Sequence, residues 1–266
     1  MVSTFFTHLF YTVSFQIASL FGIFFVLGFL LSILTQWTNA LYRRSIGWKG
    51  ILWTAWIGTP IHEMGHVLFA KLFRHRIGHV SLFQPNEATG GLGHVGHSYD
   101  TRSLYQRIGN FFIGAAPLLF GSLVLYLLLS FLVPNGSIAF SALRTYAVTG
   151  DGFFPALHTF FLTLFSSENI RAWEFWVFLY VSFSIAVHSV PSAQDRKGMW
   201  HGFLFLIFLL IIVNSVMLLF KVNTTYYVMQ IRAYLTIFTA IMLYTLLLSC
   251  IHAVLAYLLL RPFIRK

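Results

Sequence analysis

The stretch ILWTAWIGTPIHEMGHVLFAKLF occupies residues 51 to 73 and places a metal-binding motif inside an apolar segment. A run of about 20 such residues is long enough to cross a hydrocarbon core of roughly 30 Å as a helix. His62, Glu63 and His66 within it form the pattern HExxH. Because residues four apart lie on one face of a helix, the two imidazoles can bind one metal ion, with Glu63 next to them as a general base. The stretch therefore predicts a metal site within a membrane-crossing helix.

The rest of the chain is similarly apolar. Of its 266 residues, 58% are hydrophobic and 9% are charged, whereas an ordinary soluble domain carries about 25% charged residues. We therefore expect an all-α polytopic membrane protein, located in the cell membrane, with a single transmembrane domain over residues 1–266. The six predicted spans are Phe15 to Trp37, Ile51 to Phe73, Ile108 to Val133, Trp173 to Val190, Trp200 to Phe220 and Tyr234 to Leu260.

The charged residues are mainly basic and lie mostly between the apolar stretches. Seventeen Lys and Arg against seven Asp and Glu give a net charge of +10, which is typical of topology signals and of contact with anionic lipid headgroups. Six spans put both termini on the face with more Lys and Arg, so we expect cytoplasmic termini. No basic domain stands outside the membrane, so no nucleic acid is expected as a partner. The single cysteine, Cys250, excludes an intramolecular disulfide.

Two connections are long enough to carry structure of their own. Residues 74–107 contain an alternating stretch, a Pro85-Asn86 break and a glycine-rich stretch, which together predict a hairpin or small sheet at one membrane face. Residues 134–172 contain several turn signals and an apolar patch from Phe153 to Phe165. We expect this second connection to lie on the membrane or to re-enter it.

A catalytic zinc site usually has three protein ligands and one open position, so HExxH needs a third ligand. Among the seven acidic residues, Asp195 is the best candidate, because it follows the fourth span, which runs in the same direction as the second and ends on the same side. Pro191 and Gly198 are expected to break the helix there. The alternative is an interfacial Asp195 paired with Arg196 or Lys197.

Other polar residues near the same face are candidates for contact with substrate. His94 and His97 in the glycine-rich connection could be metal ligands, partners of Asp195 or substrate contacts, or simply surface histidines. Asn110 could hydrogen-bond the substrate backbone or a transition-state oxygen. The small residues from Gly109 to Gly121 predict close packing of the third span against the second. We assign no role to His8, His75, His158, His201 and His252.

This arrangement resembles the site-2 protease family of intramembrane zinc metalloproteases. In that family one span carries HExxH and a later span supplies an aspartate as third zinc ligand, and His62, Glu63, His66 and Asp195 match those positions. The resemblance covers residues 51–198 and implies one Zn²⁺ per chain. It departs from the family in the setting of the aspartate, which is usually Asn-Pro-Asp-Gly or Leu-Asp-Gly, and in lacking a PDZ-like domain. The chain is thus similar to a compact or divergent branch.

The resemblance implies a metalloendopeptidase that hydrolyses a peptide bond of a membrane protein or peptide, with Glu63 as base for a water molecule that the zinc activates. A transmembrane substrate must be extended there, because a helix hides its amides, and a strand within residues 79–97 could hold it by strand addition. Two other classes stay open. One is a membrane zinc hydrolase or transferase acting on a lipid or lipid-linked group, and the other is a non-catalytic metal-binding scaffold, channel or carrier.

Overall fold

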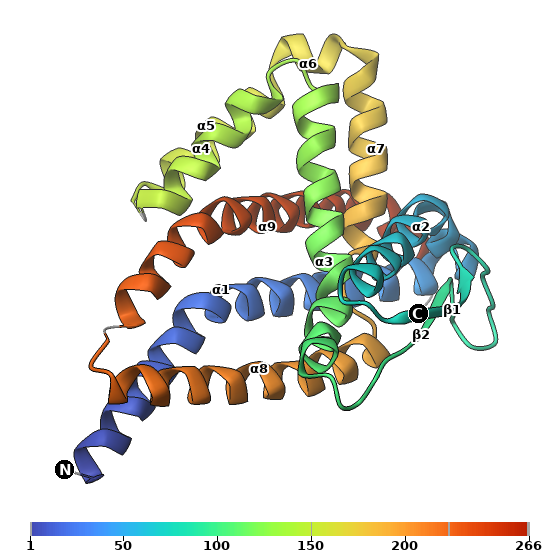
Figure 1. Cartoon of the computed structure of the whole chain (residues 1–266). Coiled ribbons are helices and arrows are strands. Elements are labelled where there is room, and N and C mark those ends of the chain that lie inside the picture. The colour runs from blue at the N-terminus through green and yellow to red at the C-terminus, as the bar shows by residue number, and fades with distance from the viewer. Residues whose placement is uncertain (1, 150, 223, 265–266) are drawn as a thin grey trace.

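The computed structural model describes residues 2–149, 151–222 and 224–264. Within these ranges the chain is helical apart from one small sheet (Figure 1). The elements in chain order are α1 (Val2–Ser45), α2 (Trp48–Leu72), β1 (Arg76–Ser81), β2 (His94–Ser98), α3 (Leu104–Leu132), α4 (Gly136–Thr149), α5 (Phe153–Leu164), α6 (Ser167–Arg171), α7 (Trp173–His188), α8 (Ala193–Leu219), α9 (Thr224–Leu260) and the 3₁₀ helix η1 (Arg261–Phe263).

Four helical segments of the described residues are long and apolar enough to cross a membrane, and they are Phe5–Ser45, Leu104–Leu132, Ala193–Leu219 and Leu235–Phe263. The predicted all-α class is therefore confirmed, but six spans are not. Helix α7 has 16 residues, which at 1.5 Å per residue is roughly 24 Å and less than a full hydrocarbon core. Helix α2 has 25 residues, but its site residues and lysines make it more polar.

The outer surfaces of these helices are apolar. In α1 and α8 only 17% of the most apolar 18-residue window is buried inside the protein. Large side chains such as Phe29, Leu204 and Leu219 are each more than 60% exposed, at 66%, 64% and 71%. Contiguous apolar surface of this size is unfavourable in water, so the fold is that expected of a protein surrounded by lipid.

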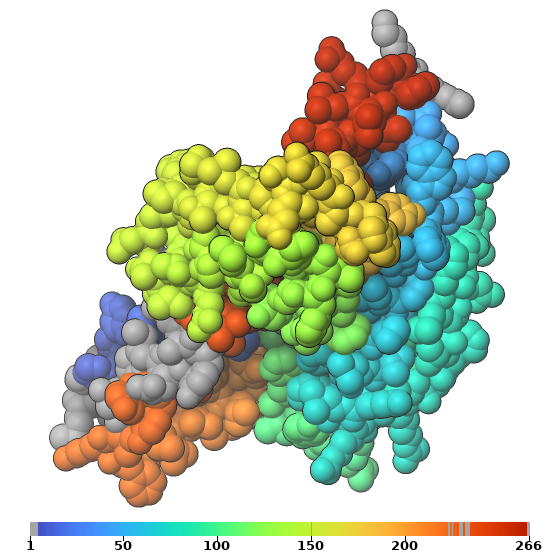
Figure 2. All heavy atoms as spheres, turned by 90° about the horizontal axis from the view of Figure 1, so that it is seen from above, coloured from blue at the N-terminus to red at the C-terminus, as the bar shows by residue number. Residues whose placement is uncertain are grey.

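Helices α3 and α7 stand side by side, and α1, α8 and α9 run across them (Figure 1). The largest core cluster lies where α3, α4, α5, α7 and α9 meet, and it includes Leu129, Leu143, Phe160, Phe178 and Tyr244. The apolar patch from Phe153 to Phe165, predicted to lie on or re-enter the membrane, forms α5, with α4 before it and α6 after it. Seen from above, the segment from α4 to α7 covers the middle of the molecule, with α2 along one side (Figure 2).

Helices α2 and α7 run parallel, as predicted for the second and fourth spans. The hydroxyl of Tyr180 donates to the carbonyl of Trp53 at 2.6 Å, and the Nδ1 of His62 lies 2.6 Å from the carbonyl oxygen of His188. From Trp53 to His62 along α2, the partner on α7 moves from Tyr180 to His188, so the two helices run in the same direction. Gly58 permits this approach, since a Cβ there would collide with the carbonyl oxygen of Ser184.

The predicted sheet is a two-stranded antiparallel hairpin. Strand β1 pairs with β2 in the register Arg76 to Ser98, Ile77 to His97, Val80 to Val95 and Ser81 to His94, with an irregularity between Ile77 and Val80. An isolated bridge between Asn86 and Gly91 continues the pairing toward the turn. The hairpin contacts α2 and brings residues 90–97 to the side of HExxH.

Small residues on α3 allow close helix packing, but mainly against a different partner from the one predicted. A Cβ at Gly114 would collide with the start of α8, at the carbonyl oxygen of Asp195, and one at Gly121 would collide with the side chain of Ser189. Helix α2 approaches at Ala116, whose carbonyl oxygen lies 3.1 Å from where a Cβ at Gly65 would be. The small face of α3 therefore holds α8 as well as α2 next to the site.

Candidate metal centre

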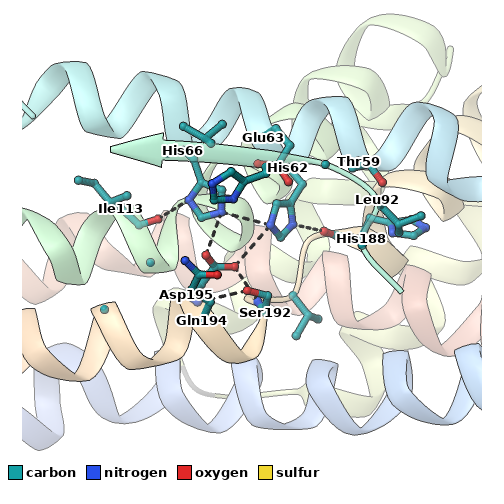
Figure 3. A pocket seen from close by; sticks show the side chains of 18 of the residues that line it. Thr59, His62, Glu63, His66, Leu92, Ile113, His188, Ser192, Gln194 and Asp195 are labelled. Carbon is teal, nitrogen blue, oxygen red and sulfur yellow. Dashed lines mark hydrogen bonds and ion pairs between the residues drawn. The ribbon is translucent and has the colours of Figure 1, made fainter. Parts of the chain in front are cut away.

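His62, His66 and Asp195 converge on one point (Figure 3). The two Nε2 atoms of His62 and His66 are 3.2 Å apart. The carboxylate of Asp195 lies across from them, with Oδ1 3.3 Å from the Nε2 of His66 and Oδ2 3.6 Å from the Nε2 of His62. Two helices far apart in the sequence, α2 and α8, thus supply three donor atoms within 4.8 Å of one another.

Backbone carbonyls fix the tautomer of both histidines. The Nδ1 of His62 is 2.6 Å from the carbonyl oxygen of His188, and the Nδ1 of His66 is 2.9 Å from that of Ile113. A carbonyl only accepts, so each Nδ1 carries a proton, and each imidazole in its neutral form presents a lone pair at Nε2. Two lone pairs and a carboxylate that face one another repel unless a cation lies between them. Ligating histidines in metalloproteins are oriented in this way.

The separations fit a zinc ion. Tetrahedral zinc binds nitrogen and oxygen at about 2.0–2.1 Å, so neighbouring ligand atoms lie about 3.3 Å apart. The two Nε2 atoms are 3.2 Å apart, and the Asp195 carboxylate reaches them with different oxygens, Oδ1 at 3.3 Å from His66 and Oδ2 at 3.6 Å from His62. With one donor atom from each residue, all three donors lie within 4.8 Å of one another. Two imidazoles and one carboxylate are also a donor set found in catalytic zinc sites, which keep the fourth position open. The residues therefore fit one zinc ion with one position left for water.

The start of α8 positions Asp195. The backbone N–H of Ser192 donates to Oδ2 of Asp195 at 2.7 Å, and the N–H of Asp195 donates back to the Ser192 hydroxyl at 3.2 Å. This capping box places the carboxylate in the first turn of α8, where the helix dipole favours a negative charge. Arg196, the alternative partner of Asp195, instead donates to the carbonyl of Pro191 at 2.8 Å. The carboxylate of Asp195 lies against the two histidines.

Pro191 lies in the connection between α7 and α8, as predicted, but Gly198 does not break a helix. It lies inside α8, where a Cβ would meet nothing within 4 Å. Helix α2 continues through Pro60, which lies within it. A proline is tolerated at this depth because neighbouring helices cover the backbone groups that it leaves unpaired.

Glu63 lies next to the three converging groups and is 6% exposed. The backbone of Gly93 covers it, since a Cβ at Gly93 would lie 2.9 Å from Cγ and 3.0 Å from Oε1 of Glu63. The same Cβ would lie 2.9 Å from the carbonyl oxygen of Ser81 on β1. Only a glycine lets the hairpin lie this close to the carboxylate.

A cavity of about 660 Å³ contains the site and falls in the range of ligand pockets. The three converging residues and Glu63 line it, together with three further predicted site residues, Asn110, His94 and His97. Residues of α1, α2, α3, the hairpin and the α7–α8 connection form its walls. The structure therefore brings every predicted site residue to one cavity.

His75, to which we assigned no role, orients His97. The Nε2 of His75 is 2.9 Å from the carbonyl oxygen of Gln106, so it carries the proton and Nδ1 accepts from the Nδ1 of His97 at 3.0 Å. The second nitrogen of His97, Nε2, is then a lone pair. Burial lowers the pKa of both histidines, and Tyr99 stacks on His75. The contact follows from the pairing of Arg76 with Ser98 in the hairpin, which places His75 and His97 next to each other.

No protein-family model matches the chain, and no curated protein or solved structure matches it. The resemblance to site-2 proteases therefore rests on His62, Glu63, His66 and Asp195, and on the parallel helices α2 and α7 that bring the last of these to the others.

Proposed function

We propose that the protein is an intramembrane zinc metalloprotease that hydrolyses a peptide bond of a membrane-associated substrate. The observation that carries the proposal is the convergence of His62, His66 and Asp195, whose donor atoms lie within 4.8 Å of one another, with both Nδ1 atoms held by backbone carbonyls so that both Nε2 atoms face the carboxylate. Glu63, which completes the HExxH pattern, lines the same cavity without belonging to the converging group.

A zinc ion held by these three residues would activate water and polarise the carbonyl of the scissile bond. Glu63 would take one proton from the attacking water as the water oxygen bonds to the carbonyl carbon. It would then give that proton to the amine nitrogen as the carbon–nitrogen bond breaks. The cover of Gly93 over Glu63 limits access of bulk water to the carboxylate, which strengthens its interaction with a positive partner.

The hairpin is the element best placed to hold a substrate. Residues 90–97 line the cavity and include Gly90, Gly91, Gly93 and Gly96, which expose their backbone groups. An extended peptide could pair with the free edge of this segment and so present its amide groups to Glu63. Because glycines have no side chain, residues 90–97 leave room for the backbone of a substrate peptide to come close.

The first test is metal content. We would purify the protein in detergent and measure bound metal by elemental mass spectrometry for the wild type, His62→Ala, Asp195→Ala and Glu63→Gln. We expect about one zinc per chain in the wild type and in Glu63→Gln, and loss in the two ligand variants. A well-folded wild type without zinc would overturn the proposal.

The second test separates peptide from lipid chemistry. Membranes from cells producing the wild type or Glu63→Gln would be analysed by mass spectrometry for new peptide termini and for altered lipids. New termini within or next to apolar segments, present only with the wild type, are the expected result. Altered lipids without new termini would replace the protease by a lipid hydrolase or transferase. A zinc-loaded protein that changes neither would be a metal-binding scaffold.

A further inference from the structure

Three polar side chains on α1 and α2 line the cavity with an atom that has no hydrogen-bond partner. They are Thr35 and Asn39 on α1 and Thr59 on α2, and the atoms are the Oγ1, Oδ1 and Oγ1, respectively. Each of these atoms is buried within the part of the chain that the structure describes. A buried polar atom without a partner destabilises a fold, so a functional explanation is needed.

Several hydroxyls of α7 and α9 have partners, and among the described buried hydroxyls without one, Thr35 and Thr59 are those that line the cavity. Thr239, Thr245, Ser184 and Ser189 each donate to the carbonyl one turn earlier in their own helix, at 3.1, 3.0, 2.8 and 2.7 Å, respectively. This local bond is how a hydroxyl is usually satisfied inside a membrane. Thr35 and Thr59 do not use it. Rotation about one side-chain bond moves a threonine hydroxyl, so both residues can turn it toward the cavity that they line.

Helix α1 meets the cavity at the end where Thr59 lies, because Leu92, beside Thr59 (Figure 3), packs against a cluster that contains Leu41 and Tyr42 of α1. Thr35 and Asn39 are four apart and thus share one face of α1. Thr59 lies on the side of His62 that faces away from His66, beside Leu92 and His188 (Figure 3). A substrate that reaches from the converging groups toward this end would therefore meet α1, a helix outside residues 51–198 on which the family resemblance rests.

The lining of the cavity favours an uncharged ligand at this end. Among the described residues that line it, none is lysine or arginine, and the acidic ones are Glu63 and Asp195. Arg43 lies outside the lining, with its Nη2 3.7 Å from where a Cβ at Gly90 would be. A phosphate or carboxylate beside Thr35, Asn39 and Thr59 would therefore find no cationic side chain in the lining to pair with. Hydroxyl and carboxamide groups both donate and accept hydrogen bonds, as does an amide. The wall thus matches a neutral peptide group rather than a phospholipid headgroup.

We propose that Thr35, Asn39 and Thr59 form a subsite that binds uncharged amide groups of the substrate next to the scissile bond. This subsite rests on the proposed protease function and names its substrate class as a peptide whose residues beside the cleavage point carry no acidic group. It makes α1 part of the substrate site.

The test uses two hydroxamates as probes of the zinc-loaded, detergent-purified full chain. Acetohydroxamate chelates zinc but is too short to reach the subsite, whereas an uncharged tripeptide hydroxamate carries amide groups along the cavity. The variants are Thr35→Val, Asn39→Leu and Thr59→Val. Thr38→Val is the matched control, because Thr38 is buried on the same helix but is not among the residues that line the cavity.

We expect each of the three variants to bind the tripeptide hydroxamate about five- to tenfold more weakly, as for one lost hydrogen bond. Binding of acetohydroxamate and zinc content should stay as in the wild type, which also shows that the variants fold. Thr38→Val should change neither probe, and Thr59→Ser, which keeps the hydroxyl, should retain tripeptide affinity.

Unchanged tripeptide affinity in all three variants would overturn the subsite and leave the zinc site standing. Equal loss in Thr59→Val and Thr59→Ser would also overturn it, since packing rather than the hydroxyl would then be responsible. If a zinc-loaded wild type failed to bind acetohydroxamate, the proposed function would fall, and the subsite with it.

Discussion

Replacing Gly93 by alanine tests whether the hairpin positions Glu63. The added Cβ would lie 2.9 Å from Cγ of Glu63, whereas ordinary contacts begin at 3.4 Å, so one of the two must move by about 0.5 Å. The carbonyl oxygen of Ser81 blocks movement toward β1, since it also lies 2.9 Å from the new atom. Glu63 is therefore the group that shifts.

A misplacement of 1 Å in an active site can reduce the rate by about 10²-fold. If the barrier rises in proportion to the displacement, 0.5 Å corresponds to a loss of about tenfold. We expect this loss in the rate at which zinc-loaded Gly93→Ala hydrolyses an internally quenched transmembrane peptide, with zinc content unchanged because none of the three proposed ligands moves.

Gly78→Ala is the matched control, because a Cβ there would lie at an ordinary 3.5 Å from the carbonyl oxygen of Gly96. Both variants add one methylene-sized group to the hairpin, but only one of them touches Glu63. If Gly93→Ala hydrolysed the peptide as fast as Gly78→Ala, the hairpin would not position the base.

Three further predictions concern the base, the cap and the hairpin. Glu63→Gln should retain zinc but hydrolyse at least 10²-fold more slowly, as expected for loss of a general base, in the same peptide assay. Ser192→Ala removes the cap that orients Asp195; it should lower zinc affinity about tenfold or more in a chelator competition and destabilise the start of α8 by about 1 kcal/mol. Burial lowers the pKa of His75 and His97 below 6.5, so their neutral forms favour the folded hairpin. Its stability should be complete above pH 6.5 and fall as the pH drops below that value, seen as faster proteolytic nicking of residues 82–93 at pH 5.5 than at pH 7.5.

The sequence predicted the centre of the site because its determinants are local. HExxH on a helix fixes His62 and His66 on one face, and the parallel direction of α2 and α7 brings Asp195, just after α7, to the same side. The hairpin was also predictable, since alternation and glycine-rich turns are short-range signals. All these features depend on residues near one another in the chain or on the direction of a helix.

The features that could not be predicted depend on tertiary packing. Helix α1 is apolar all round, so its sequence does not indicate that Thr35 and Asn39 face a cavity. The contact of His75 with His97 requires the strand register, which the irregularity between Ile77 and Val80 obscures. Turn signals at residues 134–136 and 151–152 indicated a loop, whereas the segment between them forms helix α4, which packs on α9.

The two carbonyls that fix the imidazoles come from α7 and α3, while the third donor comes from α8. A bound ion would therefore act as a cross-link among four helices that are otherwise held together by packing and a few hydrogen bonds. By thermodynamic linkage, ion at 100 times its dissociation constant would add about 2.7 kcal/mol to the stability of the assembled bundle. The melting temperature in detergent should then rise with free zinc, and a chelator should first loosen the start of α8, where Asp195 is the attachment.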